Sequence, residues 1–215
     1  MSKRLQQLAG KIRKCARIYR FSKNLDVSQW RNTDEFLKDM SKKFPSHTNL
    51  NGIIFKVTAI DRLYRAMLYR RRKDYRKIAL GLMNSDIDEM LSNLRGSLNW
   101  KNLANVINAA STVAGFGNPK KAKYWVFASK YLHFHKRKIF PIFDSNANKR
   151  LNVLCKRLGL RVANDSKKNP YERFCERILS LQEALRKRVR YETSLSDLDK
   201  YLYGGKFLLR KRITR

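Results

Sequence analysis

Apolar residues recur every three or four positions along most of this chain, which is the spacing that places them on one face of an α-helix. The pattern covers residues 5–18, 53–69, 74–83 and 91–110. Only the segment KIFPIF, residues 138–143, looks extended, and no second strand is evident to pair with it. We therefore predict an all-α fold in which this segment is an irregular buried linker.

Local signals predict where two C-terminal helices begin and end. Asn169 is a favourable helix cap, and Pro170 suits the first helical turn. The shorter helix LSDLDKYLYGG is expected to stop at Gly204 and Gly205, because glycine commonly terminates helices. The helix opened by Pro170 is expected to bury Phe174, Ile178, Leu181 and Leu185.

The charge of the chain points to a polyanionic partner. Forty-nine Lys and Arg residues against seventeen Asp and Glu residues give a formal charge of +32, spread along the whole sequence. A composition with 43% apolar and 11% aromatic residues still provides a globular core. Nucleic acid is the expected partner, and a membrane is not, since no window approaches the ~18 apolar residues of a membrane span.

The cysteines and histidines do not indicate a metal or cofactor site. Cys15, Cys155 and Cys175 are far apart and odd in number, which suits a reducing compartment such as the cytoplasm. His133 and His135 have no acidic neighbour in sequence to complete a metal shell. We expect no metal and no cofactor, and we expect the cysteines to be core residues.

The segment STVAGFGNPKK joins two predicted helices, one ending near Ala110 and one beginning near Lys120. Glycines allow the backbone to approach a phosphate closely, and the free N–H groups of the second helix point at the anion. A phosphate-binding hairpin is one interpretation, and an ordinary interhelical turn is the other. The residues expected to contact DNA here are Gly115, Gly117, Lys120 and Lys121.

Asp144 is the first acidic residue after Glu89, and the intervening segment is rich in Lys and Arg. It follows the apolar run IFPIF and precedes a predicted helix that begins at Asp144 or Ser145. One interpretation is a simple N-cap, and the other is an anion that takes part in chemistry. Neighbouring cations and the helix N-terminus both favour the ionised form.

The order of these elements resembles the helix–hairpin–helix superfamily of DNA glycosylases. GFGNPKKAKYWVFASKYL is similar to the hairpin with its second helix, and FPIFDSNANKRL is similar to the linker with its aspartate. The resemblance implies a two-lobed helical fold with a cleft between the lobes, and no iron–sulfur cluster, because three cysteines cannot supply four thiolates. The implied division is a central lobe at 51–139 and a second lobe at 1–50 plus 140–215.

The resemblance also implies the chemistry of the site. Asp144 would stabilise the oxocarbenium ion formed when an N-glycosidic bond breaks, and it would activate the attacking water. Lys121 or Lys123 corresponds by helix position to the lysine that some members use as a nucleophile. Trp125 stands where members that use water can have tryptophan, so a monofunctional enzyme is expected. Lys130 is expected to pair with phosphate or with Asp144.

Base flipping out of double-stranded DNA requires a pocket and a plug. The resemblance places these in the segment FKVTAIDRLYRAMLYRRRKDYRK, with Tyr64, Arg65 and Tyr69 as candidates, while Trp125 and Lys130 would complete the pocket. Tyr64 and Tyr69 also fit the alternative of core aromatic residues at helical spacing. The further residues expected to contact DNA phosphates are Arg70, Arg71, Arg72, Lys149 and Arg150.

Two functions remain open on the sequence. The first is excision of a damaged or modified base, either a repair lesion or a modified phage base, by a monomeric enzyme. The second is a non-catalytic helical protein that binds DNA or RNA through the same hairpin. A metal-dependent nuclease is disfavoured, because such enzymes usually need clustered acids and the acids here are scattered.

Overall fold

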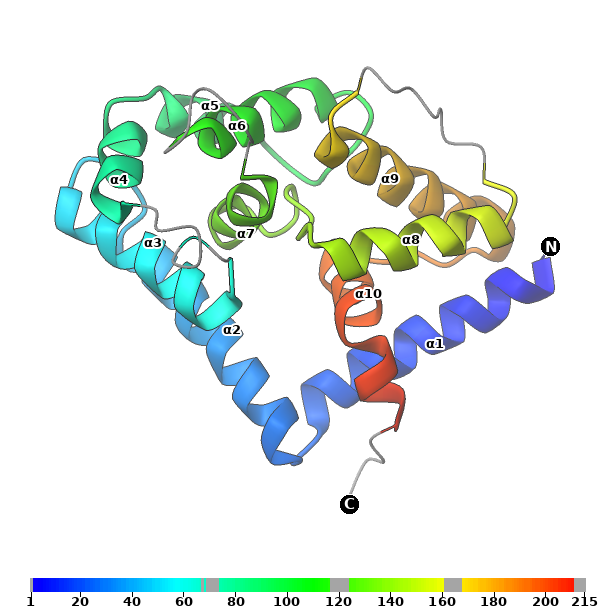
Figure 1. Ribbon diagram of the computed structural model, residues 1–215. Helices are drawn as coiled ribbons and strands as arrows, with labels where there is room; N and C mark the ends of the chain where they lie inside the picture. Colours follow the sequence, from blue (N-terminus) through cyan, green and yellow to red (C-terminus); the bar gives the residue numbers. More distant parts are fainter. Residues whose placement is uncertain (1, 67, 69–73, 117–123, 161–167, 211–215) are drawn as a thin grey trace. The chain divides into compact units, whose positions relative to one another are not determined.

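The computed structural model describes residues 2–66, 68, 74–116, 124–160 and 168–210. These residues form ten helices and contain no strand, which confirms the all-α prediction for this part of the chain (Figure 1). The helices are α1 (Ser2–Phe21), α2 (Leu25–Lys43), α3 (Leu50–Tyr64), α4 (Tyr75–Met83), α5 (Ile87–Asn93), α6 (Leu103–Gly115), α7 (Trp125–His135), α8 (Ser145–Arg157), α9 (Pro170–Val189) and α10 (Leu195–Arg210).

The chain divides into two compact units. The first combines Met1–Asn32 with Phe143–Arg215, and the second is the continuous segment Thr33–Ile142. The division predicted from sequence has its boundaries after residues 50 and 139. In the structure the first boundary falls inside α2, where the helical period gives no signal of a change between units.

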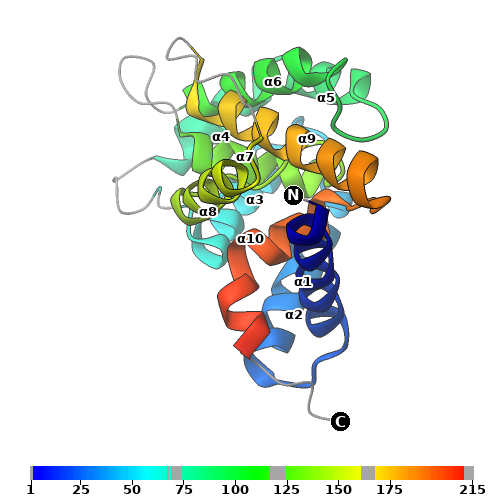
Figure 2. The ribbon, with the colours of Figure 1, turned by 90° about the vertical axis from the view of Figure 1, so that its right-hand side faces the viewer.

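The first unit is built on the apolar stripe of α1. Leu5, Leu8, Ile12, Cys15 and Ile18 are all buried there, and α1 packs against both α9 and α10. Helix α8 packs in turn on α9 and α10. The contact of α1 with α10 is visible from two directions (Figures 1 and 2).

Helix α9 begins as its sequence predicts. The side chain of Asn169 accepts a hydrogen bond from the Glu172 N–H at 2.8 Å, and Pro170 is the first helical residue. This cap satisfies one of the free N–H groups of the first turn. The predicted face is buried: Phe174, Ile178, Leu181 and Leu185 are at most 1% exposed.

The predicted stop at Gly204 and Gly205 is wrong, because α10 continues to Arg210. A Cβ atom on Gly204 would lie 2.6 Å from the indole ring of Trp30, a distance that real Cβ atoms do not show. Glycine at this position therefore permits close packing of α10 against Trp30. Sequence alone does not distinguish this use of glycine from a helix stop.

The second unit contains α3 to α7. Helix α3 packs against α4 and α7, and α6 packs against α5 and α7. The linker after α7 is buried from Ile139 to Phe143 and has neither helix nor strand, which confirms the expectation for KIFPIF. Its last residue, Phe143, directly precedes Asp144 and belongs to the first unit.

The predicted helix over residues 53–69 ends earlier, at Tyr64, where Arg65 takes a left-handed conformation with φ 52°. The cause is the buried carboxylate of Asp61. It accepts the Leu68 N–H at 2.8 Å and the Tyr75 hydroxyl at 2.6 Å. These bonds hold Leu68 and Tyr75 beside the last turn of α3.

The predicted helix over residues 91–110 is also interrupted, between the end of α5 and Leu103. Asn99 and Asn102 each accept the other's backbone N–H with their side-chain oxygens, at 2.9 and 3.1 Å. Asparagine competes in this way with helical hydrogen bonding. The Leu98 N–H donates instead to the distant Lys138 carbonyl at 2.9 Å.

The two helices on either side of the segment predicted to form a glycine hairpin have different limits from those predicted. Helix α6 continues past Ala110 to Gly115, and α7 begins at Trp125 rather than near Lys120. The Tyr124 N–H donates to the Ala114 carbonyl at 2.9 Å. This bond joins the end of α6 directly to the start of α7.

Candidate functional site

Asp144 is the N-cap of α8, as the sequence predicts. Its backbone is extended, with φ −143° and ψ 169°, and its Oδ1 accepts the Ala147 N–H at 2.7 Å. The preceding Phe143 is held by edge-to-face contacts with Tyr171 and Phe174, at centroid distances of 6.1 and 5.3 Å. The carboxylate therefore has a fixed position.

The second carboxylate oxygen of Asp144, Oδ2, has different surroundings from Oδ1. Oδ2 is buried and accepts no hydrogen bond from any part of the chain that the structure describes. A buried carboxylate oxygen almost always has a hydrogen-bond partner. Oδ2 is thus an acceptor that a bound molecule or water can satisfy, next to the positive end of a helix dipole.

Lys149 and Arg150 lie further along α8 and have different surroundings. Lys149 is exposed. One terminal nitrogen of Arg150 donates to the carbonyls of Leu202 and Tyr203, at 2.6 and 2.8 Å. Arg150 therefore ties α8 to α10, while Lys149 is accessible to an anion.

The structure brings Tyr64 and Lys130 together in the second unit. The buried ammonium of Lys130 donates to the Tyr64 carbonyl at 2.7 Å. The Tyr64 hydroxyl donates to the Asp34 carboxylate, and its ring packs edge-on against Phe134 with centroids 5.1 Å apart. Arg65 is exposed just after these residues.

The remaining predicted site residues are placed only in part. Trp125 is half-buried at the start of α7, and Gly115 is the last residue of α6. The other predicted residues of the hairpin and of the arginine run lie outside the described residues. They are Tyr69, Arg70, Arg71, Arg72, Gly117, Lys120, Lys121 and Lys123.

A polar cluster that the sequence did not predict lies in the second unit, around the buried His47. Its Nδ1 lies 2.5 Å from Asp88 Oδ1, and its Nε2 lies 2.9 Å from the Tyr131 hydroxyl. The backbone N–H of His47 also donates to Asp88 Oδ2 at 2.8 Å. The three side chains come from the loop before α3, from α5 and from α7.

Lys56 extends the cluster from α3. Its ammonium donates to the carbonyls of Phe44 and Ser46, at 2.8 and 3.3 Å, and lies 3.3 Å from His135 Nε2. Burial lowers the pKa of Lys56 to about 8, against the opposing charge of Asp88. Lys56 therefore donates to the carbonyls that follow α2. A buried ammonium needs such acceptors, because burying a charge without hydrogen bonds is unfavourable.

The protonation states follow from the pKa shifts. Burial and the charge of Lys56 lower the pKa of His47, and the same two causes lower that of His135 well below its usual value. Burial opposes ionisation of Asp88, but hydrogen bonds from His47 outweigh it and lower the pKa. Burial raises the pKa of Tyr131 well above its usual value. A neutral His47 thus donates from Nδ1 to Asp88 and accepts at Nε2 from Tyr131.

Sequence reasoning missed this cluster because its members are distant in the chain. Asp88 is 41 residues from His47, and Tyr131 is 84 residues from it. No spacing rule links such positions. His133 and His135 have no acidic neighbour in sequence, and the carboxylate that bonds His47 lies on α5.

We expect the free energy of unfolding to fall as the pH drops below about 6.5, the ordinary pKa of histidine. Since His47 and His135 have lowered pKa values in the folded protein, the unfolded chain binds more protons in this window. Each histidine then contributes up to about 1.4 kcal/mol per pH unit. Urea unfolding at a series of pH values measures this slope.

The variant His135→Gln serves as the comparison for this measurement. Between pH 6.5 and the folded-state pKa of His135, unfolding of the variant should take up as much as one proton fewer than unfolding of the wild type. The slope of the unfolding free energy against pH should be smaller by the same amount, whatever the stability of the variant at neutral pH. Equal slopes for the variant and the wild type would contradict the assignment of a neutral His135.

The cysteines are core residues, as predicted. Cys15, Cys155 and Cys175 are free thiols, and all three are buried. Burial raises the pKa of Cys15 and Cys155 to about 11, so neither is a reactive thiolate at neutral pH. Within the described residues, no group of three or more His, Cys, Asp or Glu side chains could hold a metal ion.

Comparison with known proteins identifies a family for this chain. Residues 11–139 match the model of the HI_0787_N family, described as an N-terminal domain. The match covers more than half of the 215 residues, so the chain belongs to this family. The His47 cluster lies inside the matched segment, and Asp144 lies beyond its end. No curated protein and no solved structure matches the chain.

No helix formed by the described residues is both long enough and apolar enough to cross a bilayer.

Proposed function

We propose that this member of the HI_0787_N family is a DNA glycosylase that excises a damaged or modified base, with Asp144 as its catalytic carboxylate. The observation that carries the proposal is the buried Oδ2 of Asp144, which no described residue satisfies. A residue that served only as a helix cap would need one oxygen, and Oδ1 already fills that role.

The position of Asp144 suits the proposed chemistry. Breaking an N-glycosidic bond leaves the bonding electrons on the departing base and a partial positive charge on the sugar. A fixed carboxylate stabilises this charge without reorganising during the reaction. Water then attacks C1′, and Asp144 accepts the proton that this water loses.

The proposal assigns water rather than a lysine as the nucleophile. The basis is Trp125, which stands where members of the resembled superfamily that use water can have tryptophan, while the lysine candidates Lys121 and Lys123 lie outside the described residues. Exposed cations such as Lys149 would contact the phosphates of double-stranded DNA, because a charge of +32 favours a polyanion.

Base release from modified DNA tests this function. The full-length protein is incubated with duplexes that carry alkylated, oxidised, deaminated or hypermodified bases, and free base is detected by mass spectrometry. We expect release of at least one class of base, leaving an abasic site in an uncut strand. Release should persist in EDTA, since the proposed reaction uses a carboxylate and water without metal.

The alternative outcomes are distinct. Binding to every duplex without base release from any of them would favour the second candidate, a helical DNA- or RNA-binding protein, which the high positive charge alone would support. Strand cleavage that EDTA abolishes and magnesium restores would instead indicate a nuclease. Either result would overturn the glycosylase proposal.

A further inference from the structure

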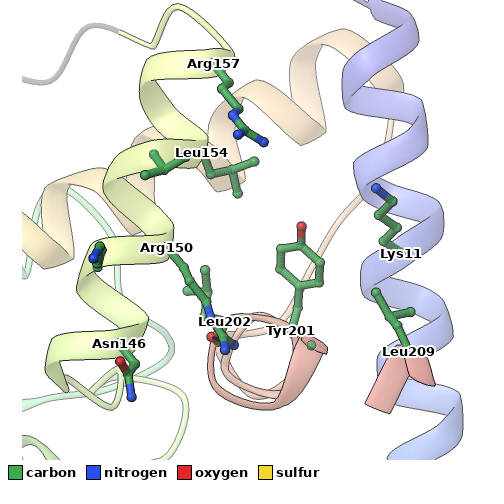
Figure 3. Close-up of a pocket in the computed structure, with 11 residues that line it drawn as sticks. Lys11, Asn146, Arg150, Leu154, Arg157, Tyr201, Leu202 and Leu209 are labelled. Carbon is green, nitrogen blue, oxygen red and sulfur yellow. Dashed lines mark hydrogen bonds between the residues drawn. The ribbon is translucent and has the colours of Figure 1, made fainter. Parts of the chain in front are cut away.

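The first unit contains a pocket of about 730 Å³, bounded by α1, α8 and α10 (Figure 3). This volume lies in the range of sites that bind small molecules. All of its lining residues belong to the first unit, and Asp144 is not among them. The pocket reaches Asn146 and Lys149 on the same helix, α8, that Asp144 caps.

The sides of the pocket carry positive charge. Lys11 of α1 and Arg157 of α8 extend toward the space between these helices, from opposite sides (Figure 3). Both are exposed, and Lys149 and Arg150 of α8 add two further cations to the lining. None of the lining residues that the structure describes is acidic.

The interior of the pocket is apolar and aromatic. The ring of Tyr201 stands between α8 and α1, with its hydroxyl pointing into the space (Figure 3). Leu154 and Leu202 lie beside it, and Val153 is 41% exposed although it is apolar. Arg150 and Arg157 are close enough to Tyr201 to oppose the burial that raises the pKa of its phenol. Flat apolar surface and cations are thus combined in one site.

Gly205 supplies a second and independent observation. Glycine inside a helix costs about 1 kcal/mol relative to alanine, so its presence in α10 needs a reason. Gly204 has one in the packing against Trp30, but a Cβ on Gly205 would meet only Tyr201, at an ordinary 3.5 Å. Gly205 lines the pocket, and a side chain there would occupy its space beside the tyrosine ring.

We propose that this pocket binds a nucleotide unit, with its phosphate between Lys11 and Arg157 and its base against Tyr201. Nucleotides combine an anionic phosphate with a flat base, and these match the two kinds of surface in the pocket. A free nucleotide and an unpaired nucleotide of a nucleic-acid strand present the same chemistry. The inference goes beyond the proposed excision activity, since it assigns a second nucleotide-binding site.

Calorimetric titration of the full-length chain tests the proposal with three probes: AMP, a short oligothymidylate and inorganic phosphate. We expect Tyr201→Leu to weaken binding of AMP or the oligonucleotide about tenfold, because base–aromatic stacking is lost. Arg157→Gln should weaken it about tenfold through loss of a charge-assisted hydrogen bond. Arg157 is exposed, so this second variant leaves the core intact.

Arg186→Gln is the matched control. Arg186 is also an exposed arginine in the first unit, on α9, and it does not line the pocket. Both variants remove one positive charge, so a purely long-range electrostatic effect would be equal in the two. We expect Arg186→Gln to bind within about twofold of the wild type.

The three probes show whether the ligand is a free nucleotide or part of a strand, and they also show whether the proposal fails. Binding of AMP supports a free nucleotide, and binding of the oligonucleotide alone supports an unpaired strand. Three results would overturn the proposal: no binding of either nucleotide probe, equal effects of the two arginine variants, or phosphate bound as tightly as AMP. Base release is measured separately, so failure here leaves the role of Asp144 undecided by this experiment.

Discussion

Asp144→Asn should lower the rate of base release by at least about 100-fold, equivalent to ~2.7 kcal/mol of transition-state stabilisation. Asparagine is nearly isosteric and can still accept the Ala147 N–H, so α8 keeps its N-cap. What disappears is the negative charge that would face the developing cation on the sugar. Single-turnover release of base, measured beside duplex affinity, should show a loss in rate with little change in binding.

The helix α4 offers a matched control for this substitution. Asp74 is also an N-cap, and its carboxylate accepts the N–H groups of Arg76 and Lys77 at 2.8 and 3.3 Å. Asp74→Asn makes the same chemical change at an exposed cap and should release base at the wild-type rate. If Asp144→Asn also kept near wild-type activity, Asp144 would be only a cap, and the proposed mechanism would be wrong.

Asp61→Ala should lower the free energy of unfolding by about 3 kcal/mol, because a buried acceptor is lost together with the hydrogen bonds from Leu68 and Tyr75. The carboxylate is fully buried and accepts the Leu68 N–H and the Tyr75 hydroxyl. Burial and the bond to Asp61 raise the pKa of Tyr75 to about 12, so it remains a donor. Denaturant unfolding followed by circular dichroism measures the loss.

Tyr75→Phe separates the two hydrogen bonds. It removes the phenol but keeps the bond from Leu68, so its cost should be about 1–1.5 kcal/mol. The difference between the variants then reports what Asp61 contributes beyond its bond to Tyr75, including the bond from the Leu68 N–H. Equal losses in both variants would show that the bond from Leu68 to Asp61 contributes nothing to stability.

The fold was predictable where the deciding interactions are local. The stripe of α1 from Leu5 to Ile18 is buried as its spacing indicates, and Asn169 caps α9 as its position indicates. The end of α3 and the start of α6 were not predictable. Asp61 and Asn102 interrupt the helical period with side-chain hydrogen bonds, and an apolar pattern carries no information about them.

The residues of the candidate site were likewise predictable only where local sequence determines them. Asp144 was found from sequence because it is an isolated acid at a helix start, and the structure confirms the cap. The pocket beside Tyr201 was not found, since its walls come from α1, α8 and α10, which are far apart in the chain. Arg150 was expected on phosphate, but its partners in the structure are two carbonyls of α10.

The sequence by itself determined the helical class, the cap at Asp144 and the positive charge, because spacing, capping and net charge depend on near neighbours or on simple sums. Only the tertiary structure decided that Gly204 admits Trp30, that Lys130 binds the Tyr64 carbonyl, and that His47 lies between Asp88 and Tyr131. The hydrogen-bond partners of Lys130 and His47 are 41 to 84 residues away along the chain. The packing of helices that are distant in the chain brings these partners together. Residue type alone does not identify them, because lysine and histidine can form hydrogen bonds with many different groups.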